Sequence, residues 1–166
     1  MTSRRRSHRS HVSYIDASRE YYAAAGYETP YEWATNDDVP FTTLPKPLAS
    51  CRVGVVVTSY LPASERPTFV SRPDHAYAVT HDHADRLENQ ELQWDKDETH
   101  TDDTETFLPL QRLAETVAAG RLGSLSPRFY GVPTQYSHRK TSKRDAPEIE
   151  EAMRADGVDV VLLVPL

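Results

Sequence analysis

The sequence has one cysteine and no long hydrophobic run. Cys51 stands alone in 166 residues, which excludes an internal disulfide and is typical of a reducing, cytoplasmic protein. No apolar run approaches the length of about 20 residues that a membrane-spanning helix needs, so we expect no membrane contact. The arginines at positions 4 to 6 are not followed by an apolar stretch, which argues against a twin-arginine export signal.

Positive and negative charges lie in separate blocks. Residues 1–11 hold four arginines and no acid, residues 74–105 hold eleven Asp and Glu against two Lys and Arg, and residues 128–144 hold five basic side chains and no acid. We predict that residues 1–11 form a disordered basic tail. The acidic middle argues against a basic binding face, so we expect no nucleic acid as a partner.

The length and a hydrophobic content of 38% predict one soluble globular domain. We assign it to residues 12–166, with a helix and an extended arm over 12–50 and an α/β body over 51–166. The apolar spacing predicts a helix from Tyr14 to Gly26. The prolines and aromatic residues over 27–47 predict an arm without regular structure.

The body is predicted to alternate strands and helices. Continuous apolar runs over 52–60 and after Gly157 are typical of strands buried on both faces, and 77–80 forms a possible short strand. Helices are expected over 109–119 and 145–155, the second with Asp145 as its N-cap. This order predicts an α/β fold, a mainly parallel sheet with flanking helices and an extended amino-terminal arm. The first and last strands should be parallel neighbours.

Ligands of open α/β sheets bind at the carboxyl ends of the strands. In this sequence only Pro165 and Leu166 follow the last apolar run. We therefore expect function to depend on earlier loops, or on a partner that supplies a loop at this position.

Histidines and carboxylates concentrate between residues 81 and 103. His81 and His83 form an H-x-H pair, which on an extended segment would place both imidazoles on one side and could hold a divalent transition metal. With His100 as a further ligand, a metal-bound water would permit hydrolase or lyase chemistry, and Asp102 and Asp103 could complete the shell. The alternative is an exposed acidic loop with incidental histidines.

A second polar segment, residues 120–140, combines glycines, aromatic residues and cations. The cations Arg128, His138, Arg139 and Lys140 could bind a carboxylate or phosphate. We place Arg128, His138 and Tyr130 in a site for a small-molecule carboxylate substrate. The alternative is a turn and a basic surface whose charge is complementary to that of the acidic block. The segment lacks the lysine and the strand context of a P-loop. Cys51 is predicted to be a small, partly buried thiol without a nucleophilic role.

Several stretches carry a resemblance that covers nearly the whole chain. They are Val12–Asp16, Arg19–Tyr22, Asp38–Phe41, Lys46–Leu48, Arg52–Val53, Phe107–Leu110, Arg112–Leu113, Gly120–Phe129, Asp145–Ile149 and Asp156–Asp159. These stretches resemble the amino-terminal part of the selenoprotein B family, the glycine, sarcosine, betaine and D-proline reductase subunits. The glycine–leucine–proline–arginine stretch over 120–129 is the most specific of them.

The resemblance implies an oxidoreductase that splits the C–N bond of an amino acid or its derivative. In this family a selenocysteine or cysteine attacks the α-carbon, and thioredoxin-type thiols supply the electrons. The family's redox residue follows a strand like Val160–Val164, where this sequence has no cysteine. We therefore expect a split or truncated half, with His100 and Asp103 as catalytic residues and a partner subunit that carries the thiol or selenol.

A non-catalytic binding or assembly protein is the alternative, because it needs no nucleophile. Under either hypothesis we expect a homodimer or a complex with a partner subunit. The aromatic arm and the last strand should both be exposed, and exposed apolar surface favours association.

Overall fold

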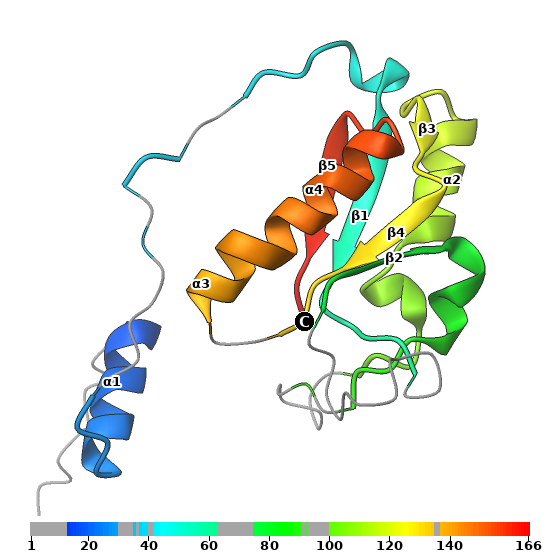
Figure 1. Cartoon of the computed structure of the whole chain (residues 1–166). Helices are drawn as coiled ribbons and strands as arrows, with labels where there is room; N and C mark the ends of the chain where they lie inside the picture. Colours follow the sequence, from blue (N-terminus) through cyan, green and yellow to red (C-terminus); the bar gives the residue numbers. More distant parts are fainter. Residues whose placement is uncertain are drawn as a thin grey trace, which may run out of the picture. The chain divides into compact units, whose positions relative to one another are not determined.

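The computed structural model describes residues 13–29, 35, 37–39, 42–62, 75–90, 92, 100–134 and 137–166. The chain divides into two compact units, Met1–Phe41 and Thr42–Leu166 (Figure 1). We describe each unit by itself. The basic tail predicted over 1–11 lies outside the described residues.

The first unit contains the helix α1, Tyr14–Ala24. The Ser13 side chain caps it by accepting a hydrogen bond from the N–H of Asp16 at 3.3 Å, and Gly26 follows its end with a φ of 88°. The predicted helix is confirmed. The Tyr22 ring packs edge-on against two neighbouring tyrosine rings, with centroids 5.5 Å and 5.6 Å away. The described residues between 27 and 47 form neither helix nor strand, as predicted.

A five-stranded sheet organises the second unit. The central strand β1 pairs in parallel with β3, β4 and β5, whereas β2 pairs antiparallel with β4. The predicted α/β fold with a mainly parallel sheet is confirmed, and so is the parallel pairing of the first and last strands. The strands are β1 (Arg52–Val57), β2 (Tyr77–Thr80), β3 (Ser124–Leu125), β4 (Arg128–Gly131) and β5 (Val160–Val164).

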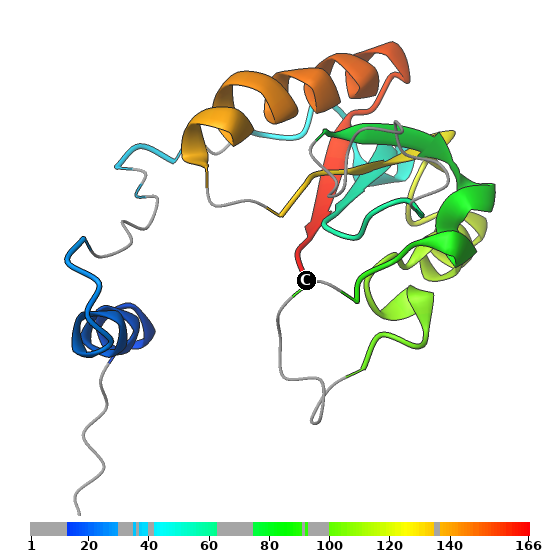
Figure 2. The ribbon, with the colours of Figure 1, turned by 60° about the horizontal axis from the view of Figure 1, so that its bottom comes forward.

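Helices cover both faces of the sheet (Figure 2). One face carries α2 (Leu110–Ala118) together with the short 3₁₀ helices η3 (His81–Arg86) and η4 (Thr104–Thr106). On the other face α3 (His138–Lys140), the π turn η5 (Thr141–Asp145) and α4 (Ala146–Ala155) run on as one helix, called α3–α4 below. A further 3₁₀ turn, η1 (Leu48–Ser50), precedes β1.

Two apolar clusters fasten these helices to the sheet. Because side chains alternate along β1, it contributes to both clusters and is buried on both faces, as predicted. At Gly54 a Cβ atom would lie 3.1 Å from a methyl group of Val158, so the glycine leaves room for the Val158 side chain. The clusters consist of Val55, Val57, Phe107, Leu108 and Phe129 on the α2 face, and of Val56, Tyr130, Ile149 and Met153 on the α4 face.

Of the two expectations for the last strand, burial on both faces is wrong and exposure is confirmed. β5 pairs with β1 along one side, and no described strand pairs with its other side. Its three middle residues, Val161 to Leu163, are exposed. An apolar run shows that a strand tolerates burial, but burial itself requires neighbours on every side.

The helix predicted over 145–155 begins earlier, and Asp145, which precedes α4, does not cap it with its side chain. Asp145 has helical dihedrals, its side chain makes no capping hydrogen bond, and it is fully buried. Its carboxylate accepts a hydrogen bond from Arg144 Nε at 2.8 Å. The cap is Ser137, whose Oγ accepts from the N–H of Lys140 at 3.3 Å. Pro147 suggested a start because proline favours the first turn, yet the chain before it is already helical.

Candidate functional site

The carboxyl ends of β1, β4 and β5 meet at one end of the sheet, which we call the carboxyl edge. The segments that leave it are Thr58–Tyr60, Val132–Thr134 and Pro165–Leu166. The N–H of Leu166 donates to Thr58 Oγ1 at 2.8 Å, so the segments after β1 and β5 are bonded to each other. Open α/β sheets bind ligands at this edge.

Ser59 places a buried hydroxyl without a partner just after β1. The residue is 1% exposed, and within the described part of the chain its Oγ makes no hydrogen bond. Its carbonyl accepts from the Tyr77 hydroxyl at 2.8 Å, and burial raises the pKa of Tyr77, which keeps that phenol a donor. An unpaired buried hydroxyl costs about 1–3 kcal/mol and is typical of a group that a ligand or water completes. Sequence reasoning missed Ser59, because no motif surrounds it.

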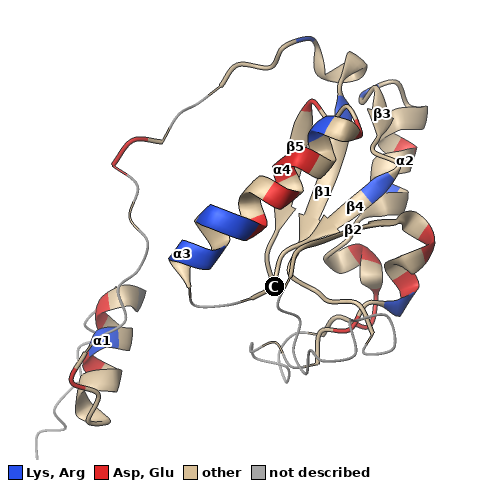
Figure 3. Ribbon diagram, in the orientation of Figure 1, with Lys and Arg blue, Asp and Glu red and all other residues tan. Residues whose placement is uncertain are grey.

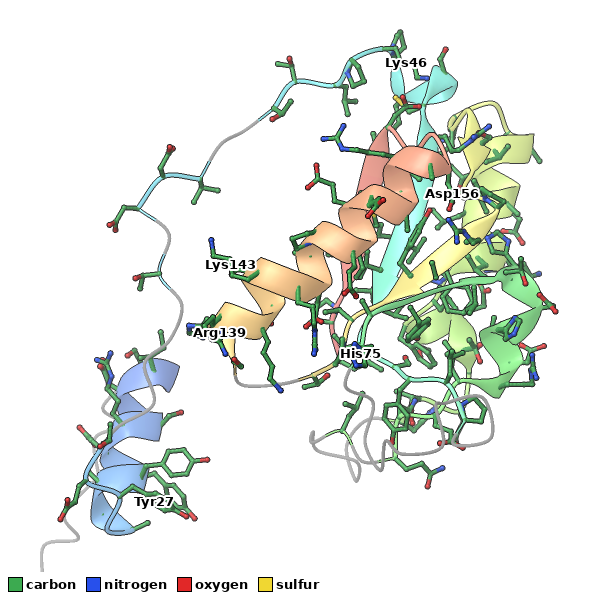
Figure 4. The ribbon with its side chains drawn as sticks, in the orientation of Figure 1. Tyr27, Lys46, His75, Arg139, Lys143 and Asp156 are labelled. Atoms are coloured by element: carbon green, nitrogen blue, oxygen red, sulfur yellow. The ribbon has the colours of Figure 1, made fainter. Side chains whose placement is uncertain are left out.

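The helix α3–α4 begins at the carboxyl edge, because it leaves β4 and returns the chain to the start of β5. Free N–H groups and the macrodipole favour anions at such a start. Lys and Arg residues are concentrated in its first turns (Figure 3). Arg139 and Lys143 are exposed there, whereas Asp156 lies at the opposite end of the helix (Figure 4). Of the predicted substrate residues, His138 belongs to this end.

The other two predicted substrate residues, Arg128 and Tyr130, lie where β4 faces the end of α4. Arg128 donates from Nε and Nη2 to the two carboxylate oxygens of Asp156, at 2.8 Å and 3.0 Å. The Tyr130 hydroxyl donates to the same carboxylate at 2.6 Å, and Ser126 Oγ lies 2.8 Å from that hydroxyl. Tyr130 is fully buried. These donors serve an internal carboxylate and tie β4 to the turn before β5.

The charges of this network stabilise one another. The hydrogen bonds from Arg128 hold the pKa of Asp156 below its usual range, and the same contact raises the pKa of Arg128. Burial, together with the bond to Asp156, raises the pKa of Tyr130 to about 12. At neutral pH the carboxylate is therefore ionised and the phenol is a neutral donor.

The predicted geometry of His81 and His83 is wrong. The strand ends at Thr80, and both histidines belong to the 3₁₀ helix η3. At about three residues per turn, side chains two positions apart point in directions roughly 120° apart, so the two imidazoles do not share one side. Among the described residues, no group of three or more His, Cys, Asp or Glu is arranged to hold a metal ion.

A shallow pocket of about 510 Å³ opens between η3 and the start of α2. It brings the predicted His81 and Asp103 together, but His83 and His100 do not line it. The His100 side chain is 72% exposed, with Nδ1 3.7 Å from Asp102, so the predicted catalytic pair does not share the pocket. The lining residues are His81, Ala84, Asp85, Asp102, Asp103, Thr104, Glu105, Leu108, Leu110 and Gln111.

Two acids of this pocket already have backbone partners. Glu105 accepts the N–H groups of Gln111 and Arg112, at 2.8 Å and 3.1 Å, and so caps α2. Asp103 Oδ1 accepts the N–H of Glu105 at 3.0 Å. The acidity of the pocket is thus partly explained by helix capping.

The thiol of Cys51 is fully buried. Its Sγ lies 3.5 Å from the carbonyl oxygens of Lys46 and Pro47. It precedes β1 and lies at the end of the sheet opposite the carboxyl edge. A reactive thiol needs solvent access, so the buried Cys51 is a packing residue.

The helices of the described segments are all too short or too polar to cross a bilayer. No family model, curated protein or solved structure matches the chain.

Proposed function

We propose that the chain is a reductase subunit of the selenoprotein B type, which binds a small carboxylate substrate at its carboxyl edge. The supporting observation is that this edge combines the ends of parallel strands with the cationic start of α3–α4. The unpaired hydroxyl of Ser59 belongs to the same edge. The stretches that resemble the family, above all residues 120–129, support the same assignment.

The chemistry of the substrate class fits this edge. Glycine, sarcosine, betaine and D-proline each carry a carboxylate next to a carbon bonded to nitrogen. Arg139 and Lys143 bind the carboxylate together with the helix start, and Ser59 donates a hydrogen bond. A thiolate or selenolate on a partner subunit forms a bond to the α-carbon while the C–N bond breaks. The amine leaves, or stays attached at the opened ring in the case of D-proline. An external dithiol is then oxidised to a disulfide, and its two electrons and two protons break the new bond to the α-carbon, which frees the acid and the thiol or selenol.

The proposed substrate residues differ from those expected from the sequence. Arg139 and Lys143 take the place of Arg128 and Tyr130, whose polar groups are bonded to Asp156. His138 keeps its predicted place, since it begins the helix. The proposed subunit binds and orients the substrate, and the partner provides the nucleophile.

Titration with betaine or glycine, followed by amide NMR, tests the binding step. We expect saturable shifts at Ser59, Arg139 and Lys143, with dissociation constants of about 1–10 mM for so small a ligand. The double variant Arg139→Ala/Lys143→Ala should weaken binding at least about tenfold. The matched control is Arg154→Ala, which removes an exposed cation paired with Glu150 near the far end of the same helix. Equal losses in both variants, or shifts centred on Arg128, would contradict the proposal.

Turnover assays test whether the chain is a subunit that needs a partner or a complete enzyme. We expect no reductive C–N cleavage by the pure chain with a dithiol, because its one thiol, Cys51, is buried. Amine release should require addition of a protein that carries an accessible thiol or selenol. Amine release by the pure chain would show that no such partner is needed.

A further inference from the structure

Exposed apolar side chains concentrate on one strand of the second unit. Val161, Leu162 and Leu163 of β5 are 41%, 38% and 70% exposed. Elsewhere among the described residues of this unit, the large apolar side chains with comparable exposure are Leu44 and Leu48. Three consecutive residues point alternately to the two faces of the sheet, so both faces of β5 are uncovered.

The backbone of β5 also offers unused hydrogen-bonding groups. The N–H of Asp159 donates to the Arg52 carbonyl at 2.9 Å, toward β1. The alternation of a strand then directs the N–H and C=O groups of Val160, Leu162 and Val164 away from β1. No described strand pairs with them. Exposed edges are normally protected by charge, proline or a bulge, and residues 160–164 contain no charged residue or proline.

We propose that β5 pairs antiparallel with β5 of a second copy, around a two-fold axis that passes through Leu162. In this register Leu162 faces its own copy, and Val160 faces Val164. Each of these pairs exchanges two backbone hydrogen bonds, because all three residues direct both groups outward. The proposed dimer joins two sheets into one continuous sheet and does not depend on the reductase proposal.

The side chains of this register are complementary. Residues directly opposite one another in an antiparallel pair share a face. Val161 therefore meets Leu163 of the copy on the α4 face, and the two Leu162 side chains meet on the α2 face. Each exposed side chain of β5 thus gains an apolar partner.

The charge distribution favours a second copy as the occupant. The chain carries a net charge of −6, so repulsion between two copies is smallest where the contact surface has no unpaired charge. The nearest acid, Asp159, is paired with Lys46 at 2.7 Å and accepts the N–H of Arg52 at 2.7 Å. In the proposed register it faces Pro165 of the copy, which separates the two Asp159 side chains to opposite ends of the strand pair.

Cysteine cross-linking of the full chain tests the register. In the Leu162→Cys variant the two introduced thiols face each other with Cα atoms about 5.5 Å apart, within disulfide reach. We expect most of this variant to form a disulfide-linked dimer under mild oxidation. In the matched Leu163→Cys variant the thiols are offset by about 7 Å along the strand, so we expect at least about tenfold slower linkage. The buried native Cys51 should stay unreacted in both.

Sedimentation of unoxidised protein tests whether the exposed strand β5 mediates dimerisation. We expect a dimer at about 100 μM for the unmodified chain and a monomer for the Leu163→Lys variant. The Leu48→Lys variant, altered at an exposed apolar residue outside β5, should stay dimeric. Circular dichroism should show that both variants are folded. If Leu163→Lys is unfolded, the ratio of the disulfide formation rates of Leu162→Cys and Leu163→Cys decides whether the proposed register is correct. A monomeric unmodified chain, a dimer that survives Leu163→Lys, or equal linkage of the two cysteine variants would overturn the proposal.

Discussion

The carboxylate of Asp156 receives hydrogen bonds from two side chains of β4, Arg128 and Tyr130. Its side chain is 12% exposed, so solvent screens these contacts weakly. Removing the charge would leave Arg128 without its counter-ion beside the core. Asp156 is therefore the residue at which a small chemical change should have a large effect on folding.

We predict that Asp156→Asn lowers the free energy of unfolding by about 2–4 kcal/mol at pH 7. Urea unfolding followed by circular dichroism measures the change. The control, Glu150→Gln, removes one partner of an exposed ion pair with Arg154 and should cost less than about 1 kcal/mol. A similar loss in both variants would argue against a special role for the Asp156 network.

The effect of Asp156 should depend on pH in a defined direction. Its pKa is lower in the folded protein than in the unfolded chain, so its contribution is fully present above the unfolded value of about 3.9. That contribution is lost as the pH falls through the lower folded pKa. The difference in the free energy of unfolding between the original chain and Asp156→Asn should therefore shrink as the pH falls from about 5 through the unfolded pKa and then through the lower folded pKa of Asp156. A difference that stays constant into strong acid would contradict this linkage.

At the scale of elements, the start of α2 depends on a residue outside the helix. Pro109 precedes α2 and makes no side-chain capping bond, and both carboxylate oxygens of Glu105 accept N–H groups of the first turn instead. A negative charge at this end also favours the helix dipole. The cap comes from η4, so two short elements stabilise each other.

We predict that Glu105→Ala lowers the free energy of unfolding by about 1 kcal/mol. Two-state thermal unfolding followed by circular dichroism would measure the change. The matched control is Glu115→Ala, which removes an exposed partner of Arg112 in the same helix and should be close to neutral. Equal losses of stability in Glu105→Ala and Glu115→Ala would show that Glu105 contributes no more than an ordinary surface charge.

At the scale of the whole molecule, the buried residues among those described all belong to the second unit. Every buried residue among those described lies between Cys51 and Met153, whereas the described side chains of α1 are exposed or half-buried. The hydrophobic driving force for folding is therefore located in residues 42–166.

We predict that deleting residues 1–41 changes the unfolding temperature of the second unit by less than about 2 °C. Differential scanning calorimetry of the two chains at equal concentration measures this. A fall of more than about 5 °C would show that the first unit contributes to the stability of the second.

Local signals were sufficient for most elements. The helices α1 and α2 were predictable because apolar spacing is a local signal, and β1 because its valine-rich sequence suits a central strand. The strand β4 was missed because Arg128 to Gly131 lies among turn residues. Its strand conformation depends on pairing with β1 and β2.

The candidate site was less predictable, because side-chain partners are separated in sequence. Arg128 was predicted to bind substrate, but in the fold it is bonded to Asp156. His81 and His83 were predicted to lie on one side of an extended segment, but in η3 they point in different directions. Arg139 was already a candidate from the sequence, but Lys143 and Ser59 became candidates only when the topology placed the start of α3–α4 and the end of β1 at one edge.

The sequence by itself determined the α/β class, the parallel pairing of β1 with β5 and the separation of the charges into blocks. The fold class and the charge blocks depend on composition and on periodicities of a few residues. The pairing of β1 with β5 follows from the order of the elements through the right-handed crossover rule. The tertiary structure alone decided which apolar strand is central and which is exposed, and which charges are satisfied internally. Those outcomes depend on neighbours more than a hundred residues away, such as Arg52 and Asp159, and no local pattern encodes them.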